Sequence, residues 1–96
     1  DDPTDFYTKL IDEVRLMYTK ARIVHGDLSE YNIMVWEGRP VIFDVSQAML
    51  TSHPLSQSLI TRDITNINSY FGRLRVDTHD ADELEQWVKG ESEKLS

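Results

Sequence analysis

Three polar residues in the middle of the chain have the types and the spacing that phosphoryl transfer uses. Asp27 is followed, after four intervening residues, by Asn32, and Asp44 comes after a further short apolar stretch. Mg²⁺ prefers oxygen ligands and bridges substrate phosphates, so one carboxylate and one amide oxygen are a typical share for the protein. Asn32 and Asp44 are therefore candidate metal ligands. Asp27 then remains to accept a proton from the attacking hydroxyl or to orient it.

The neighbouring polar residues have structural interpretations as well. Taken singly, aspartate and asparagine are common turn residues whose side chains bond nearby backbone, so only the ordered set points to chemistry. His25 is predicted to hold the loop backbone through a hydrogen bond. Asp63 lies on the apolar face of a predicted helix, and we expect backbone N–H groups of the 25–27 turn to be its donors. Glu30 is either a third acidic contact or a solvated loop carboxylate.

The first predicted helix runs from Asp2 to about Arg22. Asp2 can cap it, Pro3 suits the first helical position, and Asp5 favours the positive end of the helix dipole. Its predicted buried face consists of Phe6, Leu10, Val14, Met17 and Ala21.

A β-hairpin is predicted next, from two β-favouring runs around a glycine turn. The runs are Ile33–Trp36 and Pro40–Phe43, and the turn is Glu37–Arg39. Ile23 and Val24 form only a short apolar entry to the polar loop. Because an isolated hairpin is marginally stable in water, we expect it to pack against the helices.

Two further helices follow. Pro54 is predicted to open the second, whose apolar stripe consists of Ile60, Ile64, Ile67, Phe71 and Leu74. The third is predicted over Ala81–Lys89, with a capping box formed by Asp80 and Glu83. The tail 91–96 is expected to be loose.

Composition limits the class of protein. The 96 residues suit one small domain, and none of them is cysteine. The formal charge is −7, so the chain should repel a phosphate backbone, and we do not expect direct nucleic-acid binding. The longest apolar run is too short to span a bilayer, and no signal peptide is visible. The absence of cysteine fits the cytoplasm. The chain begins with Asp1 rather than methionine, and we expect it to be part of a longer protein.

Several motifs in order resemble one known family. The segments HGDLSEYN (residues 25–32) and IFDVSQ (residues 42–47) are followed by His53-Pro54, by Arg62-Asp63 and by NIN at residues 66–68. Together they resemble the RIO family of atypical serine protein kinases, in particular its first subgroup. The resemblance extends from the first helix to about Phe71.

The resemblance implies an α+β, mainly α fold: a protein-kinase-like carboxy-terminal lobe over residues 1–96, with helices around a catalytic loop and a small hairpin. It implies ATP and Mg²⁺ as cofactors, Asp27 as the catalytic aspartate, and Asn32 and Asp44 as metal ligands. In this family the aspartate at the position of Asp44 is also reported to take up phosphate as an acyl-phosphate. By analogy with kinases generally, Met34 and Phe43 would lie under the adenine.

The family also implies partners: a protein substrate, the protein itself through autophosphorylation, and the maturing small ribosomal subunit. Val45-Ser46 and Ser29 depart from conventional protein kinases in the way expected of a RIO protein. The chain contains no Gly-rich phosphate loop and no strand-borne lysine. The ATP-covering lobe is therefore missing from these residues, and we predict that they turn over ATP poorly by themselves.

Two other interpretations stay open. A small-molecule phosphotransferase of the aminoglycoside or choline kinase type also carries His-Gly-Asp followed by asparagine, although Ser29–Tyr31 and Asp44–Gln47 favour RIO. A non-catalytic docking module that keeps the lobe as a scaffold is the second. Retention of Asp27, Asn32 and Asp44 argues against it without guaranteeing turnover.

Overall fold

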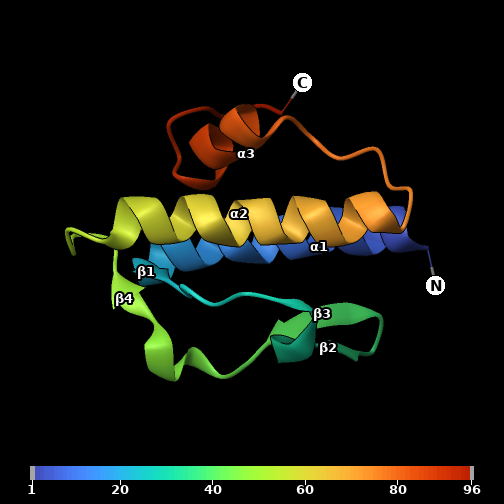
Figure 1. Cartoon of the computed structure of the whole chain (residues 1–96), viewed down its shortest axis with the longest axis horizontal. Coiled ribbons are helices and arrows are strands. Elements are labelled where there is room, and N and C mark those ends of the chain that lie inside the picture. Colours follow the sequence, from blue (N-terminus) through green and yellow to red (C-terminus); the bar gives the residue numbers. More distant parts are fainter. Residues whose placement is uncertain (1, 96) are drawn as a thin grey trace.

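A computed structural model describes residues 2–95, which form a small α+β structure. The helices are α1 (Pro3–Leu16), α2 (Ser56–Arg73) and α3 (Ala81–Val88), and the strands are β1 (Ile23–Val24), β2 (Ile33–Trp36), β3 (Arg39–Ile42) and β4 (Met49–Leu50). A π-helical segment, Met17–Ala21, continues α1, and short 3₁₀ turns cover Glu30–Asn32 and Val45–Gln47. In Figure 1, α1 and α2 lie side by side in opposite directions, with α3 on one side of the pair and the strands on the other. None of the helices in residues 2–95 is long and apolar enough to cross a membrane.

Helix α1 and its π-helical continuation together begin and end where the sequence predicts. The Asp2 side chain accepts the N–H of Thr4, and Arg22 ends the segment in a left-handed conformation with φ 59°. The predicted face is confirmed for Leu10 and Val14, but Ala21 is exposed. The last turn is π-helical, and its wider i→i+5 bonding turns Ala21 away from the apolar face.

The buried arc of α1 is wider than predicted, because Tyr7 and Ile11 are also buried. This helix contacts both α3 and the hairpin, so more than one stripe of its surface is covered. The core gathers buried side chains from all three helices together with Val24, Leu28 and Val76. Its members are Tyr7, Leu10, Ile11, Val14, Val24, Leu28, Ile60, Ile64, Ile67, Phe71, Val76, Leu84, Trp87 and Val88.

The predicted hairpin is confirmed as β2 and β3, which pair antiparallel from Ile33 with Ile42 to Trp36 with Arg39. Arg39 belongs to β3 rather than to the turn. The turn is therefore only Glu37 and Gly38, with φ 52° and 74°. Two central residues at positive φ match the right-handed twist of the flanking strands.

A second two-stranded sheet was not predicted. Strand β1 pairs antiparallel with β4, with Ile23 opposite Leu50 and Val24 opposite Met49. The two strands are only two residues long and far apart in the sequence, so no local pattern indicates them. This pairing brings the start of the polar loop 25–32 next to the segment that follows Asp44.

Helix α2 begins at Ser56, two residues after the proline that was predicted to open it. The apolar stripe is confirmed for Ile60, Ile64, Ile67 and Phe71. Leu74 is 44% exposed because the helix ends at Arg73, so its side chain leaves the stripe.

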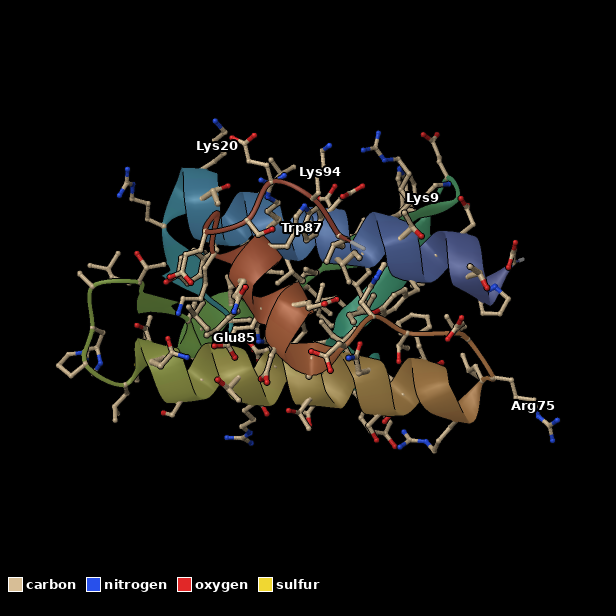
Figure 2. The ribbon with its side chains drawn as sticks, turned by 90° about the horizontal axis from the view of Figure 1, so that it is seen from above. Lys9, Lys20, Arg75, Glu85, Trp87 and Lys94 are labelled. Carbon is tan, nitrogen blue, oxygen red and sulfur yellow. The ribbon has the colours of Figure 1, made fainter. Side chains whose placement is uncertain are left out.

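Helix α3 agrees with its prediction, with Leu84, Trp87 and Val88 buried and the Asp80 side chain accepting the N–H of Glu83. It packs on both α1 and α2, and Figure 2 shows Trp87 toward α1 and Glu85 toward α2. A guanidinium–aromatic contact of 4.7 Å joins Arg15 to the Trp87 ring. The predicted loose tail is partly wrong, since Leu95 packs against the core; residue 96 lies outside the described residues.

Polar side chains tie α3 to α2. The Glu85 carboxylate accepts hydrogen bonds from Gln57 at 2.7 Å and from Thr61 at 2.6 Å, and Lys89 donates to the amide oxygen of Gln57. The side chains of Lys89 and Glu85 are mostly buried. This hydrogen-bond network therefore helps to orient α3, in addition to the packing of its apolar side chains.

Candidate functional site

The polar loop 25–32 is held along α2 by a buried carboxylate. Asp63, only 1% exposed, accepts the backbone N–H of Gly26 at 2.8 Å and of Leu28 at 3.0 Å. Asn66, one turn further along α2, donates its amide to the Leu28 carbonyl at 3.2 Å. The expected structural role of Asp63 is confirmed, with one change: the second donor is Leu28, one residue beyond the predicted 25–27 turn.

Burial raises the pKa of the Asp63 carboxyl, and the N–H donors of Gly26 and Leu28 together with the charge of Arg62 lower it in part. The carboxyl therefore sits in a poorly hydrated place where its two hydrogen bonds cannot be replaced by water. The loop backbone is fixed to α2 at this point.

His25 joins the two segments that carry the candidate aspartates. Its Nε2 lies 3.0 Å from the Phe43 carbonyl, and its Nδ1 accepts the Asp27 N–H at 3.2 Å. These partners require the neutral tautomer with the proton on Nε2, because a carbonyl accepts and an N–H donates. The predicted supporting role of His25 is confirmed: it ties the backbone at Asp27 to the residue before Asp44.

Asn32 braces the inside of the loop. Its side chain is buried, its Oδ1 accepts the Ser29 N–H at 2.8 Å, and its Nδ2 donates to the Asp27 carbonyl at 2.7 Å. The amide oxygen has two lone pairs, and one of them is used by Ser29. A metal contact would use the second.

Asp27 and Asp44 open onto one cavity. This open cavity of ≈ 410 Å³ is lined by Gly26, Asp27, Asp44, Ser46, Gln47, Met49, Leu59 and Arg62. Both carboxylates are exposed, and Ser46 donates to Asp44 Oδ1 at 3.2 Å. The structure thus brings the two predicted aspartates together, although seventeen positions separate them in the sequence.

Asp44 has an uncommon backbone conformation, left-handed with φ 60° and ψ 55°. Aspartate tolerates this region better than most residues but still at some cost, and such positions concentrate at functional sites. Here the conformation ends the run from β3 and turns the chain into the 3₁₀ turn Val45–Gln47.

The backbone conformation of Gly26 favours glycine. Its φ is 86°, whereas an added Cβ would make only ordinary contacts, with the Leu59 side chain at 3.4 Å and the Gln47 carbonyl at 3.6 Å. Glycine adopts this region without the steric penalty that a Cβ brings. The residue beside Asp27 therefore lies close both to α2 and to the segment after Asp44.

Arg62 was not predicted to belong to the site. Its guanidinium Nη2 lies 3.6 Å from Asp27 Oδ1, and it lines the same cavity as both aspartates. Arg62 is exposed and lies away from the apolar face of α2. The sequence could have indicated this position, because Arg62 directly precedes Asp63 and Asp63 was expected to bind the backbone of the loop that contains Asp27.

Met34 and Phe43 are 55% and 39% exposed, on the hairpin and just after it. They are not among the residues that line the cavity of Asp27 and Asp44, and neither is Asn32. Met34 pairs across the hairpin with Val41, and the Phe43 N–H bonds the Asn32 carbonyl, so these apolar residues sit beside the loop rather than at the aspartates.

Three further polar residues, Glu30, Ser29 and His53, each have a partner in the structure. Glu30 forms an ion pair of 3.4 Å with Arg73, near the end of α2, and the Ser29 hydroxyl accepts the Tyr31 N–H at 3.3 Å. The His53 ring accepts the Leu55 N–H at 3.1 Å within its own turn. Contacts of this kind stabilise a loop and the turn before a helix.

The donor set fits a hard cation with phosphate ligands. Two exposed carboxylates on one open cavity can contribute oxygen ligands, and Mg²⁺ usually takes only one or two from protein and the rest from water and phosphate. Asp44 and Asp27 are the groups in position to contribute. Such an ion, if bound here, would neutralise negative charge on a phosphoryl group.

The sequence matches known proteins over most of its length. Residues 1–84 match the family described as the RIO domain. The chain is 45% identical over 85 residues to the RIO-type serine/threonine-protein kinase Rio1 of Methanocaldococcus jannaschii, covering 88% of this chain and 29% of that protein. It is 37% identical over 84 residues to the serine/threonine-protein kinase RIO1 of Homo sapiens, covering 88% of this chain and 15% of that protein.

A third relative is the serine/threonine-protein kinase RIO1 of Saccharomyces cerevisiae, which is 37% identical over 76 residues, 79% of this chain and 16% of that protein. The chain thus spans less than a third of the length of these relatives.

Proposed function

Because the chain belongs to the RIO-domain family, whose matched relatives are named serine/threonine-protein kinases, we propose that it is the carboxy-terminal lobe of an atypical kinase of the first RIO subgroup. The observation that supports this most is the shared cavity. Asp27 and Asp44 reach it from two loops, and His25 joins the backbones of those loops.

In this proposal Asp27 orients the acceptor hydroxyl or takes its proton, and Asp44 holds Mg²⁺ on the phosphates of ATP. Asn32 contributes its second lone pair to the metal or acts only as the brace of the loop. Met34 and Phe43 offer an exposed apolar surface to the adenine. Nearly all of the catalysis then comes from positioning and charge, since phosphoryl transfer asks for little covalent chemistry from the protein.

The wider role proposed here rests on family resemblance. The acceptor is a serine of a protein substrate or of the protein itself, and the assembly served is the maturing small ribosomal subunit in the cytoplasm. Phosphate uptake by Asp44 is a further part of the proposal: a carboxylate oxygen attacks the γ-phosphorus and ADP leaves. Label on Asp44 would then be released by hydroxylamine, whereas label on serine would stay.

The experiment incubates the full-length protein with labelled ATP and Mg²⁺ and compares wild type with Asp27→Asn and Asp44→Asn. We expect Asp27→Asn to lower phosphoryl transfer by roughly 10²- to 10⁴-fold, the usual share of a positioned acid or base. Asp44→Asn should lower it as well, because the carboxylate proposed to hold Mg²⁺ is lost. Asp77→Asn is the matched control, because that aspartate is exposed and far along the chain from the loop. Survival of both label incorporation and ATP hydrolysis in the two site variants would show that the site is elsewhere.

A second measurement tests the assignment of the lobe. The purified 96-residue chain should hydrolyse ATP poorly, because the predicted ATP-covering lobe is not among these residues. Robust Mg²⁺-dependent ATP hydrolysis by the purified 96-residue chain would contradict the assignment of these residues to one lobe. Phosphate transfer by the full-length protein to choline or an aminoglycoside, but not to serine, would favour the small-molecule phosphotransferase instead.

A further inference from the structure

One edge of α2 follows the polar loop from end to end. Arg62 faces Asp27 at 3.6 Å, Asp63 binds the loop backbone, Asn66 binds the Leu28 carbonyl, and Arg73 faces Glu30 at 3.4 Å. Residues eleven positions apart lie on nearly the same side of a helix. The two arginines therefore stand at opposite ends of one edge, and each faces an acidic side chain of the loop.

The Arg62–Asp27 approach is set by buried contacts. The next residue, Asp63, makes two hydrogen bonds to the backbone on both sides of Asp27, and Leu59 lies against Gly26. The helix and the loop are thus fixed relative to each other at this point. The remaining freedom is in the side-chain torsions of Arg62 and Asp27, and an ion pair between them restricts these torsions.

Folding stability does not explain the pair. Both side chains are 59% exposed, and an exposed pair of this kind contributes little to stability. The location is more specific, since Arg62 is the cation among the residues that line the cavity of Asp27 and Asp44. An arginine fork restricts the orientation of a carboxylate more than a lysine ammonium does.

We propose that Arg62 is a positioning residue that keeps the Asp27 carboxylate turned into the cavity during phosphoryl transfer. This inference rests on the proposed function, in which Asp27 meets the acceptor hydroxyl. Arg62 acts through Asp27, so its loss lowers the rate of transfer and leaves the binding of ATP as it was.

The test measures steady-state transfer by the full-length protein carrying Arg62→Met, Arg62→Lys or Arg73→Met. We expect Arg62→Met to lower kcat about 10- to 100-fold with KM for ATP unchanged, the loss typical of a misplaced catalytic group. Arg62→Lys should retain an intermediate rate. Arg73→Met is the matched control, an exposed arginine on the same helix edge in the same kind of pair, and it should leave kcat unchanged.

Chemical rescue separates positioning from damage to the fold. Guanidinium chloride, far below the concentration that unfolds the protein, should restore part of the rate of Arg62→Ala, whereas an equal concentration of sodium chloride should not. Failure of rescue, an equal loss in the Arg62 and Arg73 variants, or a raised KM for ATP with kcat unchanged would each overturn the inference. If the wild type transfers phosphate and Asp27→Asn does not, a wild-type rate of transfer by Arg62→Met overturns only the role of Arg62. If the wild type itself transfers no phosphate, the proposed function is contradicted.

Discussion

At the scale of single residues, the site is organised by buried polar side chains that do not face the cavity. Asp63, His25 and Asn32 each bond the backbone around Asp27, while Asp27 itself stays exposed. The candidate catalytic side chain is therefore accessible to a ligand, while the backbone around it is held by hydrogen bonds. Rigid support beneath exposed functional groups is the arrangement that positional catalysis needs.

Asp63→Asn should loosen this support. The amide keeps one acceptor, so either the Gly26 or the Leu28 N–H loses its partner and meets an NH₂ group instead. We expect the free energy of unfolding to fall by about 1–3 kcal/mol. Chemical denaturation measures this, and hydrogen exchange should accelerate at one of the two amides.

The comparison variant is Asp82→Asn, an exposed aspartate in the first turn of α3. It should change the unfolding free energy by less than about 0.5 kcal/mol. Equal effects of the two substitutions would mean that the Asp63 hydrogen bonds do not support the loop.

At the scale of elements, the linker between α2 and α3 is tied to both long helices through Tyr7. The Tyr7 hydroxyl donates to Asn68 on α2 at 2.8 Å and accepts the His79 N–H at 3.1 Å, and the Asn68 amide donates to the His79 carbonyl at 2.9 Å. The Tyr7 and His79 rings stack at 5.9 Å. This triad fixes the end of the linker from which α3 begins.

Burial raises the pKa of Tyr7, and the hydrogen bond from His79 lowers it in part. Below a pH of about 10 both the folded and the unfolded states keep the phenol proton, so the contribution of Tyr7 to stability is complete. As the pH rises further, the unfolded chain loses this proton first. The contribution is then lost progressively up to the raised pKa of the folded state.

Tyr7→Phe tests this triad. At neutral pH we expect it to lower the free energy of unfolding by about 1–3 kcal/mol, since two hydrogen bonds are lost. The difference from wild type should shrink when urea denaturation is repeated above pH 10. Tyr31→Phe is the control, because Tyr31 is 84% exposed, and it should show neither effect. A difference that stays constant above pH 10 would mean that folding does not raise the pKa of Tyr7.

At the scale of the whole molecule, one core supports both faces of the helix pair. Helix α3 covers one side and the strands, with the loop 25–32, cover the other, as Figure 1 shows. The outer face of the hairpin is left uncovered: Met34, Trp36, Val41 and the following Phe43 are exposed. Exposed apolar residues in a group are a feature of surfaces that bind something, which agrees with the proposed adenine contact.

The two tryptophans distinguish these regions. Trp87 is buried under Arg15 between α3 and α1, whereas Trp36 is 67% exposed on the hairpin. We expect Trp87→Ala to lower the free energy of unfolding by about 3–5 kcal/mol. Trp36→Ala should cost less than about 1 kcal/mol. Chemical denaturation followed by far-ultraviolet circular dichroism measures both, and a larger cost at Trp36 would mean that the hairpin face is covered.

Much of the fold could be predicted from the sequence because it depends on neighbours along the chain. The capping side chains of Asp2 and Asp80, the helical stripe of α2 and the glycine turn of the hairpin each act within a few residues. The spacing of Asp27, Asn32 and Asp44 is likewise local to two loops, so the candidate residues themselves are readable. The placement of Asp63 on an apolar helix face was also sufficient to predict a buried, hydrogen-bonded carboxylate.

The tertiary structure decided what depends on residues far apart in the sequence. The pairing of β1 with β4, the triad around Tyr7, and the second bond from Asp63 to Leu28 each join segments that no local pattern connects. The same reason applies to Arg62. By itself it is a solvent-facing arginine on a helix, and it reaches the cavity only because its neighbour binds the loop there. The sequence by itself therefore determined which residues carry the candidate chemistry, and packing between distant segments determined which side chains accompany them.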